Sequence, residues 1–167
     1  MALSIYQLSV PAFIRGMTAL DNILTKAEAH AAETGTDLQD LFEARLAPDM
    51  LPLSGQIQRA SDTSKLAVAR LTGVAAPAFE DNEATFADLH ARIAKTVDYF
   101  KGVEEAAFEG AETRKIELRT QQTSLDFVGA DFLTGFALPN FYFHVTAAYA
   151  ILRNAGVPVG KRDYLGG

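Results

Sequence analysis

The sequence contains no cysteine in its 167 residues. This absence excludes disulfide bonds, thiolate metal ligands and a cysteine nucleophile, and it fits a reducing compartment. No basic residue precedes Arg15, so the amino-terminal stretch does not have the pattern of a secretory signal, which begins with positive charge. We therefore expect a cytoplasmic protein.

Long apolar runs and clusters of basic residues are also missing. No window approaches the roughly 18 uninterrupted apolar residues of a membrane span, so we expect no membrane partner. Lys and Arg number 15 against 21 Asp and Glu, which gives a net charge of −6. The basic residues never cluster beyond pairs such as Arg114-Lys115. Because the chain has no positive stripe that could follow a phosphate backbone, we do not expect nucleic acid as a partner.

The chain length fits a single domain spanning residues 1–167. A chain of this size buries roughly two-thirds of its unfolded surface and needs no cross-links. Apolar residues recur at steps of three and four in two segments of the first half of the chain. This spacing predicts two long helices, one over residues 4–32 and one from Pro52 to Gly73. Pro11 predicts either a kink or a second helix start after Ser9.

Between these helices, Thr36 and Gln39 have the spacing of a capping box and predict a short helix through Arg45. A third long helix is expected to begin at Asp81 or Asn82, either of which can serve as its cap, and to end at Gly102.

The hydrophobic period changes to two between residues 112 and 129, which predicts a β-hairpin turning at Gln121-Gln122-Thr123. A short helix from Asp131 is expected to end before Pro139, because the residue ahead of proline avoids helical angles. Pro139 then opens the last helix, which Gly156 ends. The predicted fold is all-α, a four-helix bundle with a small β-hairpin before its last helix.

The three histidines differ in their predicted environments. His30 and His90 fall off the centres of their apolar faces, and we expect them at the surface or its boundary. His144 lies within the inner arc of the last helix, with Asn140 one turn earlier on the same stripe. His144 is either a core histidine satisfied by hydrogen bonds or part of a binding site.

Gln56 lies on the inward flank of the second long helix. Because bundles build sites from inward polar residues on facing helices, Gln56, Asn140 and His144 form a candidate pocket. Tyr142 and Tyr149 are candidate hydrogen-bond partners for it, although simple packing also explains them. No Gly-x-Ser-x-Gly, glycine-rich phosphate loop or His-Glu-x-x-His motif is present, so the residues indicate no particular reaction.

Several blocks carry a resemblance to a bacterial domain-of-unknown-function family, DUF1993. They are the opening Ser4-Ile-Tyr-Gln, Ala44-Arg-Leu-Ala-Pro-Asp-Met, the stretch over residues 136–157, and Gly160-Lys-Arg-Asp-Tyr-Leu-Gly. That family is similar to the DinB and YfiT-like superfamily. The resemblance implies a four-helix bundle that often forms a homodimer, and we expect a homodimer here.

Many members of the superfamily hold a metal on three histidines, one on the second helix and a His-x-x-x-His pair on the last. The resemblance places that pair at Asn140 and His144, and Gln56 is the nearest counterpart of the third histidine. Only His144 is retained as a candidate ligand. Amide oxygens are poor ligands for Zn²⁺ or Ni²⁺, so no metal and no other cofactor is expected, with a divalent metal as the lesser alternative.

Three functions stay open from the sequence. The first is a non-catalytic small-molecule-binding or interaction protein with a degenerate metal site and a small polar ligand. The second, implied by the resemblance, is a metal- or thiol-dependent transferase or hydrolase of the DinB and YfiT type. The third is a structural dimer without a ligand. The apolar residues after Gly156 also predict that the carboxyl-terminal tail folds back on the bundle.

Overall fold

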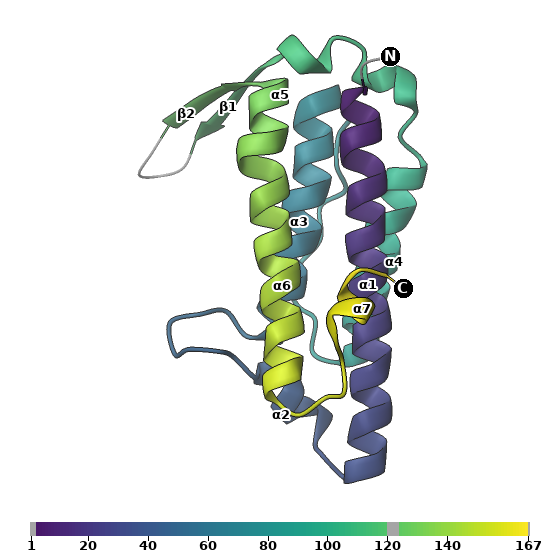
Figure 1. The fold of residues 1–167 in the computed structure, drawn as a ribbon. Helices are drawn as coiled ribbons and strands as arrows, with labels where there is room; N and C mark the ends of the chain where they lie inside the picture. The colour runs from purple at the N-terminus through teal and green to yellow at the C-terminus, as the bar shows by residue number, and fades with distance from the viewer. Residues whose placement is uncertain (1–2, 120–123, 167) are drawn as a thin grey trace.

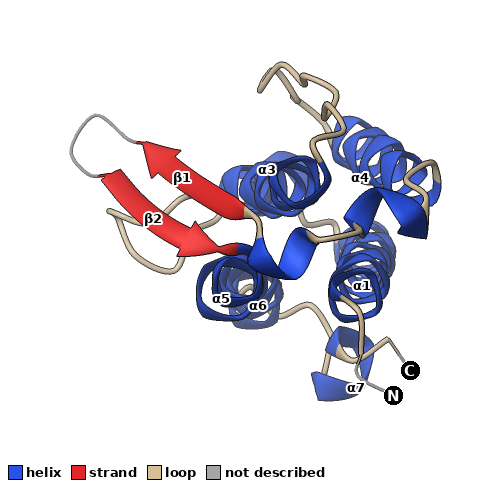
Figure 2. Ribbon diagram, turned by 90° about the horizontal axis from the view of Figure 1, so that it is seen from above, coloured by secondary structure: helices blue, strands red, loops and turns tan. Residues whose placement is uncertain are grey.

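The computed structural model describes residues 3–119 and 124–166. Four long helices form an up-and-down bundle, and a two-stranded hairpin projects from one end (Figure 1). Seen from above, α3 neighbours both α4 and α6, and α1 closes the ring between those two helices (Figure 2). The long helices are α1 (Ile5–Thr34), α3 (Leu53–Thr72), α4 (Phe86–Lys101) and α6 (Leu138–Asn154). The predicted bundle with a hairpin before its last helix is confirmed.

Aromatic side chains fill the centre of the bundle. Phe13 of α1 packs edge-on against Phe141 of α6, with ring centroids 5.0 Å apart, and lies 5.8 Å from the ring of Phe100 of α4. Gly16 permits the close approach of α1 and α6, because a Cβ there would lie 2.5 Å from an atom of the Phe141 ring. The three rings are fully buried, and each contributes roughly 1.5–3 kcal/mol by leaving water.

The starts of two helices differ from the predictions. Ser4 caps α1 through a capping box with Gln7, and the helix continues through Pro11. A second start after Ser9 is therefore wrong, since the Ser9 hydroxyl donates within the helix to the carbonyl of Ile5. The short helix α2 (Leu38–Glu43) is capped by Asp37, whose carboxylate accepts from the Gln39 amide.

Helix α4 begins four residues later than expected from Asp81. Thr85 is its cap, because the Thr85 hydroxyl accepts from the Asp88 amide at 3.2 Å while the Asp88 carboxylate accepts from the Thr85 amide at 2.9 Å. Asp81 and Asn82 stay in the preceding loop. The Asp81 carboxylate is instead paired with Arg59 and Arg92, an interaction that local spacing does not reveal.

The hairpin pairs β1 (Lys115–Arg119) with β2 (Ser124–Val128) in antiparallel register. Its predicted turn at Gln121-Gln122-Thr123 lies outside the described residues. Ile116 and Leu118 of β1 are buried against the bundle end, and Phe127 of β2 packs on Phe132 and Phe136. Leu125 of β2 is exposed. Two short 3₁₀ turns, Glu105–Phe108 and Ala111–Thr113, connect α4 to β1.

The segment before the last helix is continuous helix, so the predicted break at Pro139 is wrong. Helix α5 (Gly129–Phe132) runs into a π-helical turn (Leu133–Ala137) and then into α6. The wider π turn lies just ahead of Pro139, the residue that has no amide hydrogen and whose ring crowds the preceding turn of an α-helix. This local widening allows the chain to stay helical.

The tail folds back as predicted. Val157 and Val159 are buried, and Arg153 donates to the Val159 carbonyl at 2.7 Å. The last helix, α7 (Lys161–Tyr164), then lies against α1, where Asp163 pairs with Lys26. Within the described ranges, none of the helices combines the length and apolar character needed to cross a lipid bilayer.

Candidate functional site

The centre of the candidate site is a hydrogen bond between α6 and α3. His144 Nδ1 lies 2.8 Å from Gln56 Oε1, and Gln56 Nε2 donates to the Leu51 carbonyl at 3.1 Å. Because the amide nitrogen must face that carbonyl, the amide oxygen faces the imidazole. His144 Nδ1 therefore carries the proton, and Nε2 of the neutral ring is left as the acceptor.

The surroundings of His144 favour this neutral form. Burial lowers the pKa of His144 below its usual value, and the positive charge of Arg59 lowers it further. Arg59 lies three residues after Gln56 on α3 and forms ion pairs with Asp62 and Asp81. A fixed guanidinium thus stands near the imidazole, on the side of the bundle where α3 and α6 face each other.

Asn140 does not join the pair. Its Nδ2 donates to Thr63 Oγ1 at 3.2 Å, nearer the hairpin end of the same helix–helix contact. Both residues line a groove of about 240 Å³ between α3, α6 and β1. The expectation that Gln56, Asn140 and His144 converge on one point is therefore met by two of the three.

The pair is formed well inside the last helical segment and not at its start. Helix starts at Gly129 and is continuous into α6, so His144 lies about four turns along it, opposite the first turn of α3. The loop that carries Leu51 covers the pair from the amino-terminal side of α3.

Tyr142 and Tyr149 lie on another stripe of α6, so their predicted place in the pocket is wrong. Tyr149 packs against Tyr164 of α7, with ring centroids 5.8 Å apart, and Tyr142 packs edge-on against Phe141. Burial raises the pKa of the Tyr142 hydroxyl. Two residues along a helix correspond to a rotation of about 200°, which directs Tyr142 away from the His144 face.

The residues present do not fit the three-histidine metal site that the superfamily implies. His144 offers one imidazole, and the other two positions offer the amides of Gln56 and Asn140, each already engaged in hydrogen bonds. Throughout the part of the chain that the structure describes, no three His, Asp or Glu side chains are grouped as metal ligands. The guanidinium of Arg59 adds a positive charge that opposes a divalent cation.

The other two histidines lie at the protein boundary. His30 is half-buried near the end of α1. His90 bridges two carboxylates of α1, with Nδ1 at 2.5 Å from Asp21 and Nε2 at 3.2 Å from Glu28. The carboxylates contact opposite nitrogens of the ring, so this cluster ties α4 to α1.

Sequence reasoning missed the charged residues around the site. Arg59 shares the inward face of Gln56 by its spacing of three, a signal that was available. For the buried Arg92 of α4, helical spacing gives no signal. Its partners lie on other elements, Asp62 on α3 and Glu83 in the loop before α4, each at 2.8 Å. Arg59 and Arg92 share both Asp62 and Asp81, which links α3, α4 and the loop between them.

Together, the four-helix bundle and the projecting hairpin define a DinB-like fold. The family model for a domain of unknown function, DUF1993, matches residues 5–165, and the chain belongs to this family. A crystal structure of a DinB family member from Shewanella denitrificans is similar, with a TM-score of 0.92 and 44% identity, covering 98% of this chain and 92% of that one. No curated protein matches the chain significantly.

Proposed function

We propose that the chain is a non-catalytic small-molecule-binding protein that uses the α3–α6 face of its bundle, with a degenerate metal site at His144. The observation that carries the proposal is the bond between His144 Nδ1 and Gln56 Oε1 at 2.8 Å, which joins a neutral imidazole to an amide. Such a pair is suited to hydrogen-bonding a polar molecule. It lacks the ligands that activate water on a metal ion.

The adjoining groove indicates the chemistry of the ligand. Arg59, Arg70 and Arg119 line it against a single carboxylate, Asp62, and its apolar wall includes Phe136. Arg59 is paired with Asp62 and Asp81, and Arg119 with Glu117, so Arg70 is the guanidinium of the groove that forms no ion pair among the described residues. An unpaired guanidinium beside an apolar wall favours a small molecule with an acidic group and a carbon skeleton. At about 240 Å³ the groove has room for a ligand the size of a single ring.

Three probes of one shape test this proposal: benzoate, benzyl alcohol and benzylamine. The C–H signals of the three histidine rings would be followed by NMR as each probe is added. We expect benzoate to shift the His144 signals most and benzylamine least, because Arg59 is close to that ring. Equal responses to all three probes, or none at His144, would rule out an acid-binding groove.

A matched pair of variants locates the binding. Arg70 lines the groove, whereas Arg162 lies on α7 outside it. Arg70→Gln should weaken benzoate binding about tenfold, the effect of losing one charge-assisted hydrogen bond, and Arg162→Gln should not. Equal losses in the two variants would indicate general charge attraction.

The alternative is a metal- or thiol-dependent transferase or hydrolase of the DinB and YfiT type. The observation that favours it is the 44% identity to a DinB family member, together with the retained His144. Metal analysis of protein purified without an affinity tag separates the alternatives. One equivalent of a transition metal that is lost in His144→Ala would favour the enzyme.

A further inference from the structure

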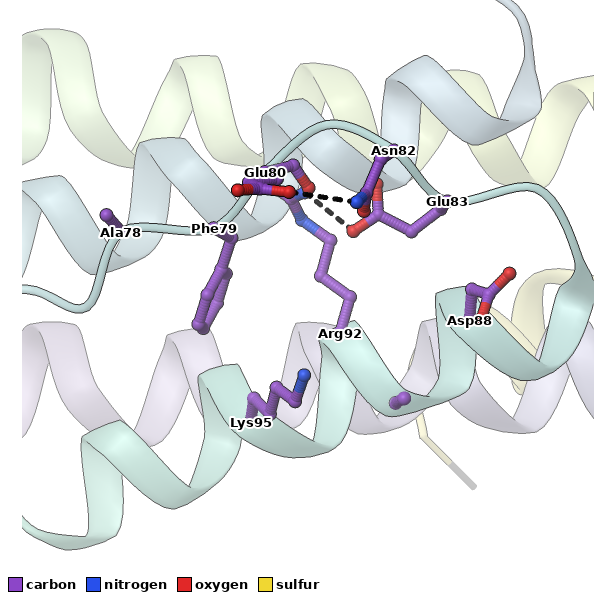
Figure 3. A pocket seen from close by; sticks show the side chains of 9 residues that line it. Ala78, Phe79, Glu80, Asn82, Glu83, Asp88, Arg92 and Lys95 are labelled. Carbon is purple, nitrogen blue, oxygen red and sulfur yellow. Dashed lines mark hydrogen bonds and ion pairs between the residues drawn. The ribbon is translucent and has the colours of Figure 1, made fainter.

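A second pocket lies on a different side of the bundle, between α4 and the loop that precedes it (Figure 3). It has a volume of about 450 Å³. The loop contributes Phe79, Glu80 and Asn82, and α4 contributes Asp88, Arg92 and Lys95. Figure 3 shows Arg92 and Lys95 rising from α4 toward the loop, with Phe79 on one side and Asp88 on the other.

The wall of this pocket contains a buried donor that lacks an acceptor. The Arg92 side chain is only 1% exposed, and its two terminal nitrogens bond to Asp62, Asp81 and Glu83. Its Nε–H has no partner among the described residues. A buried guanidinium normally satisfies every donor, so this atom requires an acceptor that the described chain does not provide.

The charges around the pocket are unevenly paired. Glu83 is paired with Arg92, whereas Lys95, Glu80 and Asp88 form no ion pair within the described part of the chain. Hydrogen bonds from Thr85 and the Ala84 amide hold the pKa of Asp88 low, so this group is a carboxylate. The pocket therefore presents one ammonium group and two carboxylates that form no ion pair among the described residues, around an unsatisfied Arg92 Nε–H, and the carboxylates accept hydrogen bonds from Asn82, Thr85 and Ala84.

A simple anion or a simple cation complements only part of this arrangement. An anion that reaches Lys95 and Arg92 is repelled by Glu80 and Asp88, and a cation that approaches those carboxylates leaves the Arg92 donor unsatisfied. A molecule that carries both charges complements both sets. The half-buried ring of Phe79 gives such a molecule an apolar wall for its carbon chain.

We propose that this pocket binds a small zwitterion of the amino-acid class. The ligand carboxylate lies between the Lys95 ammonium and Arg92 Nε, and the ligand ammonium faces Glu80 and Asp88. None of the residues that line this pocket lines the α3–α6 groove, although Arg92 pairs with Asp62 of that groove. The two proposals use different probes and different variants, so either can fail while the other holds.

Three probes with the same four-carbon chain test the charge requirement: γ-aminobutyrate, butyrate and n-butylamine. Binding would be measured by calorimetry on the full chain, with the melting temperature as a second readout. We expect γ-aminobutyrate to bind and to raise the melting temperature, and each single-charge probe to bind at least about tenfold more weakly. If butyrate or butylamine binds as tightly as γ-aminobutyrate, the zwitterion proposal is wrong. If none binds, water satisfies Arg92 Nε and the proposal also fails.

Surface variants locate the two charges without disturbing the buried Arg92. Lys95→Gln should weaken γ-aminobutyrate binding about tenfold, and Glu80→Gln should weaken it while leaving butyrate no weaker than before. Lys101→Gln is the matched control, because Lys101 lies on α4 outside the pocket. A control variant that loses as much binding as Lys95→Gln would overturn the proposed position of the ligand carboxylate.

Discussion

His144 and Gln56, which are 88 residues apart in the chain, are joined by a hydrogen bond of 2.8 Å between α6 and α3. The Gln56 amide is fixed in turn by the Leu51 carbonyl, so its oxygen must accept from the imidazole. The contact between α3 and α6 is therefore organised around a neutral imidazole. This arrangement has consequences for stability that can be measured.

The first prediction is a histidine-dependent loss of stability in acid. Burial and Arg59 lower the pKa of His144 in the folded chain below the value of 6.5 that it regains on unfolding. Below that value the unfolded chain binds the proton first, so the free energy of unfolding falls as the pH falls toward the folded pKa. The slope from this group is at most about 1.4 kcal/mol per pH unit.

Urea unfolding at pH 7.5 and pH 5.5 measures this effect. His144→Gln is the control, because it keeps His30, His90 and all carboxylates and removes only the group in question. We expect the original chain to lose more stability between the two pH values than the variant loses. Identical losses would show that the His144 imidazole does not titrate as its burial requires.

The second prediction concerns the start of α4. Thr85→Ala removes a capping hydroxyl and should lower the free energy of unfolding by about 1 kcal/mol. Asn82→Ala, at a position that the sequence also favoured as a cap, should change it by less than about 0.5 kcal/mol, because Asn82 is exposed and bonds only to Glu80. The reverse order in thermal unfolding would place the cap at Asn82.

The error at this helix came from overlooking a local signal. Asp81, Asn82 and Thr85 are all good capping residues, but only Thr85 is followed three residues later by an acidic residue, Asp88, which is the spacing of a capping box. The pairing of the Asp81 carboxylate with Arg59 and Arg92 then holds Asp81 in the loop, and this contact is not visible in local spacing. The four long helices were predictable because their periodicity is a property of each segment by itself.

The candidate site was predictable to the same extent. The positions of His144 and Gln56 on inward arcs follow from helical spacing, and their contact follows from the packing of α3 on α6. Tyr142 was misplaced because sequence distance was taken for closeness across a helix, where two residues point in nearly opposite directions. The charge of Arg59 beside His144 was missed, although Arg59 lies one helical turn after Gln56 on α3 and its spacing was a usable signal.

The third prediction concerns the tail. Deleting residues 158–167 removes the buried Val159 and the bond from Arg153 to its carbonyl. Loss of the valine alone should cost roughly 1.5–3 kcal/mol, which would appear as a lower melting temperature. As a control, deleting only residues 166–167 should leave the melting temperature unchanged. A tail deletion without effect would mean that these contacts do not contribute to stability.

The fourth prediction is a homodimer. Several large apolar side chains remain exposed on the single chain, including Leu8, Leu46, Leu51, Leu66 and Phe143. Such side chains are often covered by a second copy in this kind of bundle. Light scattering at micromolar concentration should give the mass of two 18.0 kDa chains. The mass of one chain would exclude the dimer.

The central claim is that the amides of Gln56 and Asn140 have replaced a metal site at His144. Zinc titration by calorimetry, on protein purified without an affinity tag and stripped with a chelator, tests it most directly. We expect no stoichiometric binding to the original chain and one equivalent bound by the double variant Gln56→His, Asn140→His, which restores the three imidazoles of the superfamily pattern. One equivalent of zinc bound by the original chain, and lost in His144→Ala, would contradict the account.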